Sequence, residues 1–267
     1  MLGITMNIPK VNFVDYTGLF VAPPKFGKTT TASMFPNSVI VPFEMGTKGQ
    51  VVNVAKNVKD WASFIQFVDG LEQNREAIGS QIQTIVFDTV NKAYEKCETY
   101  TLRKLSIADK KKYKTMGDVA HGKAYAEKDK FFVEQIDRII ALGFNILFIS
   151  HMKVKTVRPK NGEPYDVYSS TMPERLEGII NPLVDFILNG EKRVVEGVEK
   201  RVLLTKGSSM ADSGGRVSID EDIIFDTEEE AISRYQELFR ESIQKKLDKA
   251  GIKRDLDEIA KEQMEEK

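Results

Sequence analysis

The stretch Ala22-Pro23-Pro24-Lys25-Phe26-Gly27-Lys28-Thr29-Thr30 is the most informative part of this 267-residue sequence. It begins where an apolar run, Gly18-Leu19-Phe20-Val21-Ala22, ends, and the residues after it are typical of a helix. A phosphate chain needs converging backbone N–H donors, a helix N-terminus behind them, one mobile ammonium and one hydroxyl for a magnesium ion. Gly27, Lys28 and Thr29 supply these elements, so the stretch predicts a phosphate-binding loop.

The loop matches the P-loop motif except at its first glycine, where Ala22 stands. Pro23 and Pro24 lack N–H groups, so the donors must come from the residues that follow them. The alternative is an exposed basic turn before a helix, but the strand-loop-helix context favours the P-loop. The residues expected to contact a nucleotide are Pro24, Lys25, Phe26, Gly27, Lys28, Thr29 and Thr30.

The rest of the first half alternates apolar runs with helical patterns. Residues 38–43, 84–88 and 145–150 are short and apolar, as buried parallel strands are. Residues 60–73 and 118–142 place apolar side chains at three- and four-residue spacing, which predicts amphipathic helices. The sequence therefore predicts an α/β fold, with a mostly parallel sheet covered by helices on both faces.

The second half of the chain predicts hairpins and then a charged helical segment. Residues 152–158 and 164–170 flank a polar turn and predict a hairpin, and residues 193–198 with 201–205 predict a second one. From Glu228 onward a helical apolar period returns within a highly charged sequence. We expect residues 1–226 to form the core domain and residues 227–267 to form a charged helical C-terminal tail.

Composition excludes several classes of protein. The 39 basic and 40 acidic side chains give a net charge of -1, so contact with nucleic acid or an anionic membrane would need a local patch. The single cysteine, Cys97, cannot form an internal disulfide, and with two histidines a structural zinc site is not expected. No apolar window reaches the roughly 18 residues of a membrane span. We expect a cytoplasmic protein with no membrane contact.

Three polar side chains follow predicted strands and are candidates for catalysis. Asp88 ends the run 84–88, where a P-loop protein carries an aspartate that orders magnesium and its water, and Thr29 is the expected second oxygen ligand. Glu44 could orient or deprotonate the attacking water, and His151 could sense the terminal phosphate. The alternatives are a helix-capping aspartate, a solvated loop acid and a structural histidine, respectively. With Lys28, these residues form the predicted catalytic set.

Two basic segments could meet the phosphates of a nucleic acid. One holds Lys153, Lys155, Arg158 and Lys160 and directly follows the possible phosphate sensor. The other runs over residues 103–114, with Tyr113 among its lysines as a possible base-stacking aromatic. The ordinary alternative for each segment is a solvated face. Lys206 and Arg216 are candidates for fingers that reach a neighbouring subunit's nucleotide, with plain surface roles as the alternative.

The order of P-loop, Glu44, Asp88 and His151, followed by basic hairpins, resembles the RecA-like core, and in detail phage-encoded RecA-like ATP-binding proteins of the single-strand annealing type. The resemblance covers residues 18–216. It implies that Glu44 is the catalytic glutamate and that His151 couples nucleotide state to a DNA-binding loop. It further implies ATP and Mg²⁺ as cofactors.

The function that this resemblance implies is Mg²⁺-dependent ATP hydrolysis in phage DNA recombination or single-strand annealing. The expected partners are single-stranded DNA, further copies of the chain in a ring or filament, and a single-strand-binding protein. Two other functions stay open: another P-loop motor or switch, such as a helicase loader or regulatory ATPase, and an ATP-gated assembly module with little hydrolysis.

Overall fold

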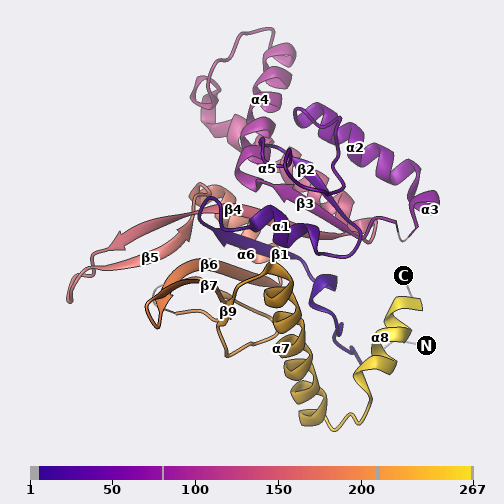
Figure 1. Cartoon of the computed structure of the whole chain (residues 1–267). Coiled ribbons are helices and arrows are strands. Elements are labelled where there is room, and N and C mark those ends of the chain that lie inside the picture. Colours follow the sequence, from indigo (N-terminus) through magenta and orange to yellow (C-terminus); the bar gives the residue numbers. More distant parts are fainter. Residues whose placement is uncertain (1–5, 80, 209–210, 266–267) are drawn as a thin grey trace.

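The computed structural model describes residues 6–79, 81–208 and 211–265. The described strands form one sheet in the order β2-β3-β4-β1-β6-β7-β9, with β5 beside β4 and β8 beside β6 (Figure 1). The strands are β1 (Gly18–Ala22), β2 (Ser38–Pro42), β3 (Thr84–Asp88), β4 (Asn145–Val157), β5 (Tyr165–Ser170), β6 (Phe186–Val195), β7 (Val198–Leu204), β8 (Gly214–Gly215) and β9 (Ile223–Phe225). The helices are α1 (Lys28–Ser33), α2 (Trp61–Gln73), α3 (Arg75–Ile78), α4 (Val90–Ala108), α5 (Lys123–Ala141), α6 (Glu174–Leu183), α7 (Glu228–Lys249) and α8 (Leu256–Glu265), with 3-10 turns at Phe13–Asp15, Met116–Asp118 and Ala120–Gly122.

Strands β2, β3, β4, β1 and β6 run parallel to one another, so their carboxyl ends meet at one edge of the sheet. At this edge Ala22 of β1 pairs with His151 of β4, and Asp88 of β3 pairs with Pro42 of β2. Beyond β6, strands β7 and β9 extend the sheet in antiparallel fashion. Ligands of open α/β sheets bind outside the carboxyl ends of the strands, so this edge is where a site is expected.

Alternate side chains of the parallel strands enter two separate cores. Leu19, Val41 and Phe87 belong to the core beneath α2, α4, α5 and α6, whereas Phe20 and Ile40 belong to the core beneath α1 and α7. Strands buried on both faces explain the near-continuous apolar runs of the sequence. The predicted α/β class, with a mostly parallel sheet and helices on both faces, is confirmed (Figure 1).

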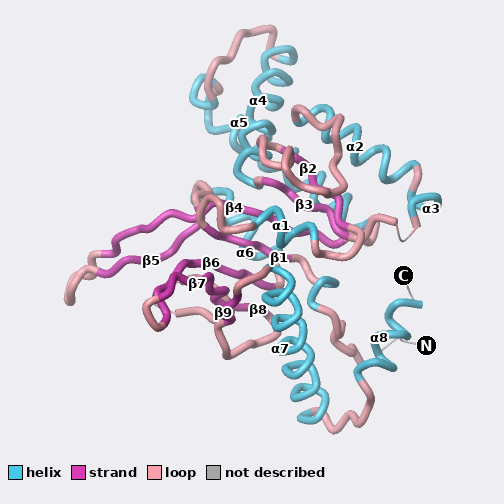
Figure 2. Tube along the Cα trace, in the orientation of Figure 1, coloured by secondary structure: helices cyan, strands magenta, loops and turns pink. Residues whose placement is uncertain are grey.

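Strand β4 is longer than the sequence predicts. Its first half lies between β1 and β3, and its second half continues into an antiparallel pair with β5, from Met152 opposite Ser170 to Val157 opposite Tyr165. The sequence treats these halves as two elements, but one strand carries both. The predicted hairpin is confirmed and projects from the body of the molecule, as the magenta strands β4 and β5 at the left of Figure 2 show. The second predicted hairpin is the β6–β7 pair.

Two helices differ from the sequence prediction. Helix α5 begins at Lys123 rather than near residue 118, because residues 116–122 form two 3-10 turns and Gly122 takes a left-handed conformation before the helix. Helix α4 was not predicted, although its buried residues Val90, Ala93, Tyr94 and Cys97 have the helical period. The predicted helix over 60–73 is confirmed as α2.

The C-terminal segment forms the two helices α7 and α8. The Thr227 side chain caps α7 by accepting a hydrogen bond from the Glu230 N–H at 3.2 Å. Tyr235 of α7 packs edge-on against Phe13, with ring centroids 4.9 Å apart, inside the core that also holds Phe20 of β1. A division between residues 1–226 and 227–267 stays a prediction. None of the described helices combines the length and apolar character that crossing a membrane requires.

Candidate nucleotide-binding site

The predicted P-loop connects β1 to α1 at the carboxyl edge of the sheet. Gly27 precedes the helix with a φ of 105°, a left-handed angle that glycine tolerates. The backbone then turns into the helix, and the Thr31 N–H donates to the Gly27 carbonyl at 2.8 Å. Pro24 and Lys25 are exposed, whereas the Phe26 ring is buried between Phe20 and Phe225. Only the backbone of Phe26 can therefore face a nucleotide.

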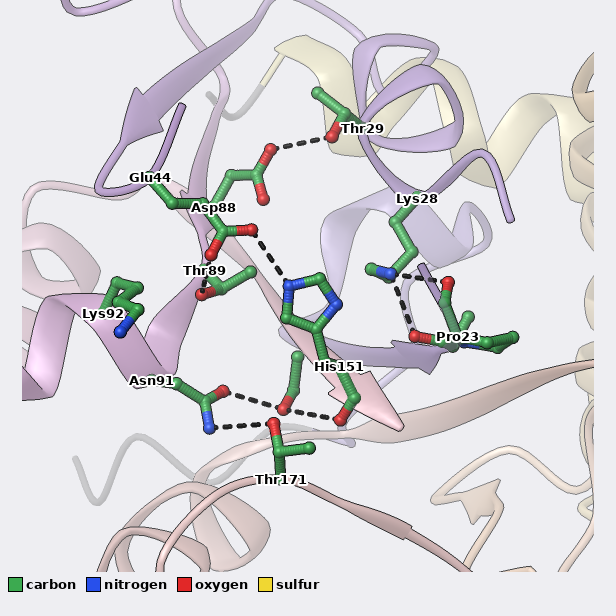
Figure 3. Close-up of polar contacts among 12 residues, drawn as sticks. Pro23, Lys28, Thr29, Glu44, Asp88, Thr89, Asn91, Lys92, His151 and Thr171 are labelled. Carbon is green, nitrogen blue, oxygen red and sulfur yellow. Dashed lines mark hydrogen bonds and ion pairs between the residues drawn. The ribbon is translucent and has the colours of Figure 1, made fainter. Parts of the chain in front are cut away.

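Lys28 lies inside the loop with a side chain that is almost fully buried. Its Nζ donates to the carbonyls of Ala22 at 2.9 Å and Pro23 at 2.8 Å (Figure 3). Burial lowers the pKa of Lys28 to about 8, and the nearby carboxylates of Asp88 and Glu44 oppose that shift. The ammonium is thus positioned at the loop by acceptors that an anion's oxygens could replace.

Thr29 and Asp88 bring two oxygens together at the same edge. The Thr29 hydroxyl donates to the Asp88 carboxylate at 2.8 Å (Figure 3). Burial raises the pKa of Asp88, and the hydrogen bond from Thr29 opposes the increase. One hydroxyl and one carboxylate from the protein, completed by phosphate and water oxygens, fit the oxygen-only preference of Mg²⁺. Within the described residues no cluster of three or more metal-binding side chains offers a different metal centre.

Glu44 lies between His151 and Thr89, the residue that follows Asp88. Its carboxylate accepts from the Thr89 hydroxyl at 3.3 Å and lies 3.0 Å from His151 Nε2 (Figure 3). The Glu44 N–H also donates to the Asp88 carbonyl at 3.1 Å, which ties the loop after β2 to the end of β3. The structure therefore brings Lys28, Thr29, Glu44, Asp88 and His151 to one edge, from the start of α1 and the carboxyl ends of β2, β3 and the parallel part of β4. The roles assigned to them stay predictions.

Behind His151 a second set of polar contacts fixes the end of β4. The Ser150 hydroxyl donates to the Asn91 side chain at 2.8 Å, and Asn91 donates to the Thr171 hydroxyl at 3.2 Å (Figure 3). Thr171 follows β5, and its N–H donates to the His151 carbonyl at 2.8 Å. The base of the projecting hairpin is thus hydrogen-bonded to the strand ends that carry the candidate site. Asn91 and Thr171 could not be predicted as part of this site, because neither stands in a motif.

Three further residues at the P-loop were missed. Gly190 lies beneath the Phe26 ring, where a Cβ would stand 2.4 Å from a ring carbon. A glycine inside a predicted strand signals close approach and could have indicated this contact. Arg201 and Glu228 meet each other and the loop at Phe26 and Gly27, and no local signal marks them. Glu228, in the predicted C-terminal tail, thus lies beside the P-loop.

The candidate nucleic-acid residues lie away from the P-loop. Lys153, Lys155, Arg158 and Lys160 are all exposed on the projecting β4–β5 hairpin. Residues 103–114 form the end of α4 and the turn after it, where the Tyr113 hydroxyl donates to Asp109 at 2.9 Å.

The two candidate trans fingers make contacts within their own chain. Arg216 pairs with Asp185 at 3.2 Å, beside the amino end of β6 and thus at the opposite edge of the sheet from its own P-loop. Lys206 donates to the Asp220 carbonyl at 3.3 Å. A role for either residue in a neighbouring subunit stays a prediction.

Two known proteins are similar to parts of this chain. The chain is 24% identical over 165 residues to the SPbeta prophage-derived uncharacterized protein YorG of Bacillus subtilis (strain 168), which covers 60% of this chain but only 44% of that protein. Among solved structures, the KaiC-like protein PH0186 of Pyrococcus horikoshii OT3 aligns with a TM-score of 0.40 and 11% identity, over 79% of this chain and 90% of that one.

A family model covers most of the chain. The model described as an AAA domain matches residues 15–217, the span from the segment before β1 to the end of β8. That span contains the P-loop, the parallel strands and both hairpins. The predicted RecA-like α/β P-loop core is confirmed, and the chain belongs to the AAA domain family of P-loop NTPases.

Proposed function

We propose that this protein binds and hydrolyses ATP with Mg²⁺ and uses the nucleotide cycle to act on single-stranded DNA in phage recombination or strand annealing. The observation that carries the proposal is the convergence of the Lys28 ammonium, the Thr29–Asp88 oxygens and the Glu44 carboxylate at one sheet edge. These are an anion-binding cation, a pair of hard oxygen ligands and a general base, the three kinds of group that phosphoryl transfer needs.

Nucleotide binding would use the loop backbone together with Lys28. The N–H groups at the start of α1 face the phosphates, and the Lys28 ammonium exchanges its two carbonyl acceptors for phosphate oxygens. Thr29 and Asp88 would hold the magnesium ion. Bound there, the ion neutralises charge on the terminal phosphate oxygens.

Hydrolysis would use Glu44 as the base. Its carboxylate accepts a proton from water as the water oxygen bonds to the terminal phosphorus, and the bond from that phosphorus to the bridging oxygen breaks, releasing ADP and phosphate. Thr89 and His151 contact the two carboxylate oxygens and thereby fix the orientation of the base. His151 is also the proposed sensor, because it ends the strand that continues into the hairpin.

The DNA part of the proposal rests on the β4–β5 hairpin. Its four basic side chains are exposed, and none of them forms an ion pair within the described residues. By contrast, Lys192 and Lys200 of the β6–β7 hairpin are paired with Glu199 and Asp226. Unpaired cations on a projecting ribbon suit a phosphate backbone. The prophage origin of the relative YorG supports a phage role.

One experiment tests the proposal in two steps. Calorimetry of MgATP binding to the parent and to Lys28→Ala asks whether the loop is a nucleotide site; equal affinities would rule that out. Lys92→Ala is the matched control, since Lys92 lies nearby but pairs with Glu95 on the surface. Measurement of ATP turnover with and without single-stranded DNA then separates a DNA-stimulated ATPase from an assembly module or another P-loop switch.

A further inference from the structure

Arg201 joins the P-loop to the segment that begins α7. From β7, its Nη1 lies 3.3 Å from the Phe26 carbonyl and 2.5 Å from the Glu228 carboxylate, and its Nη2 donates to the Asp226 carbonyl. The guanidinium carbon also lies 4.8 Å from the centre of the Phe225 ring. The planar fork of this arginine is therefore held on several sides at once, which lysine could not reproduce.

Glu228 occupies the other side of the loop's last glycine. A Cβ on Gly27 would stand 2.2 Å from Glu228 Oε1 and 3.3 Å from Arg201 Nη1, so the ion pair is seated directly against Gly27. The two side chains are only 17% and 24% exposed. Position 27 thus requires glycine for two reasons. Its φ is positive, and the Arg201–Glu228 pair fills the space that a Cβ would occupy.

The contact with the Phe26 carbonyl has a consequence for the anion site. In a planar trans peptide the C=O and the N–H point in opposite directions. When Arg201 holds the Phe26 carbonyl on its own side, the Gly27 N–H is directed away from Arg201. This N–H belongs to the loop whose converging donors would bind phosphate.

Charge adds a second consequence. A carboxylate packed against a phosphate-binding loop repels a polyanion unless a cation neutralises it. Arg201 is the cation in contact with Glu228. Its removal would leave a partly buried, unpaired carboxylate at the site, which costs more than the loss of the whole pair.

We propose that Arg201 is a positioning residue for the phosphate loop, oriented by Glu228, so that the start of α7 controls nucleotide affinity without touching the reacting atoms. This inference rests on the proposed nucleotide-binding function. It makes Arg201 and Glu228 part of the support of the P-loop, although one lies in a hairpin and the other in the C-terminal segment.

The test compares MgATP affinity and steady-state turnover in Arg201→Gln, Glu228→Gln and the double variant. We expect Arg201→Gln to raise Kd and KM roughly tenfold or more with kcat nearly retained, since the pair acts on binding alone. Glu228→Gln should have a smaller effect. The double variant should bind better than Arg201→Gln, because it carries no unpaired carboxylate.

Lys200→Gln is the matched control, because Lys200 is the neighbouring residue of β7 and pairs with the Asp226 side chain at 2.7 Å. It should keep the parent affinity. Parent-like binding by Arg201→Gln, an equal loss in Lys200→Gln, or a double variant no better than Arg201→Gln would each overturn the inference. If Arg201→Gln does not fold, Arg201→Lys replaces it, and a KM for MgATP equal to that of the parent would be the overturning result.

Lys28→Ala, titrated in parallel, separates the existence of the nucleotide site from the positioning role of Arg201. If Lys28→Ala binds as the parent does, the nucleotide site itself is wrong. If Lys28→Ala loses affinity and Arg201→Gln does not, only the positioning role is wrong.

Discussion

Lys28 is the residue whose protonation should govern affinity. Its pKa, lowered to about 8 from 10.5 by burial, means that the ammonium is lost as the pH rises through about 8. ATP affinity should therefore fall between about pH 7 and pH 9.5. Between the two pKa values the unfolded chain binds more protons, so the contribution of Lys28 to the free energy of unfolding rises as the pH increases from about 8 to 10.5.

These opposite trends make the prediction specific to Lys28. Calorimetric titration at several pH values gives the affinity, and denaturant unfolding at the same values gives the stability. Lys28→Arg serves as the control, because arginine keeps its charge throughout this pH range. The affinity of this variant for ATP should not depend on pH in the way that the parent's does. A parent affinity that is independent of pH would contradict the assignment.

Glu44 and Asp88 lie at the ends of the neighbouring strands β2 and β3, and substitutions of the two residues should have different effects. Glu44→Gln keeps the shape that contacts His151 and Thr89 but removes the base, so MgATP should still bind while turnover falls roughly a hundredfold or more. Asp88→Asn should instead weaken the dependence of binding on Mg²⁺, because Asp88 supplies the carboxylate beside Thr29. Rapid-quench turnover and magnesium titrations distinguish the two. Unchanged turnover in Glu44→Gln would show that the Glu44 carboxylate has a structural role and is not the base.

At the scale of elements, the β4–β5 hairpin connects the candidate sensor to the candidate DNA surface. Strand β4 carries His151 at the sheet edge and Lys153 and Lys155 beyond it, so a shift at the terminal phosphate has a short path to the hairpin. Neutralising Lys153, Lys155, Arg158 and Lys160 together should weaken single-stranded DNA binding and flatten its salt dependence by a log-log slope of roughly 0.7 per lost phosphate contact. ATP affinity without DNA should survive.

Fluorescence anisotropy at several salt concentrations checks this expectation. The matched control neutralises Lys110, Lys111, Lys112 and Lys114, an equal number of exposed charges after α4. An unchanged slope in the hairpin variant and a reduced one in the control would move DNA binding to residues 103–114. No change in either would remove DNA from the proposal.

The elements also explain which parts of the site the sequence could predict. Lys28 and Asp88 stand in local motifs, so the sequence pattern predicts their place. Glu44 and His151 follow predicted strands, and the carboxyl ends of parallel strands meet at one edge of a sheet, so the topology predicts that they lie together. Arg201 and Glu228 meet the loop only through the register of β6 with β7 and the position where α7 begins. Neither the antiparallel register nor the start of α7 against Gly27 has a periodic signature, so this part required the structure.

At the scale of the whole molecule, the N-terminal segment and α8 close the core on the α7 side. Gln263 of α8 accepts from the Val11 N–H at 3.1 Å and donates to the Pro9 carbonyl at 3.0 Å, and Ile259 is buried in the same core as Phe20. The segment that holds Pro9 and Val11 thus lies beside α8, as Figure 1 shows. These contacts stabilise the fold at a distance from the P-loop.

Truncation after Ala250 should therefore separate stability from nucleotide binding. It removes α8 but keeps all of α7, including Glu228 beside Gly27. We expect the free energy of unfolding to fall by about 2–4 kcal/mol, from the lost burial of Ile259 and the two Gln263 hydrogen bonds, while MgATP affinity stays within about twofold of the parent. Denaturant unfolding and calorimetry measure the two quantities, and Gln263→Ala in the full chain should reproduce part of the stability loss. A truncated protein that remains folded but loses its affinity for ATP would show that α8 acts on the nucleotide site through α7, and the C-terminal segment would then belong to the ATP-binding unit as a whole.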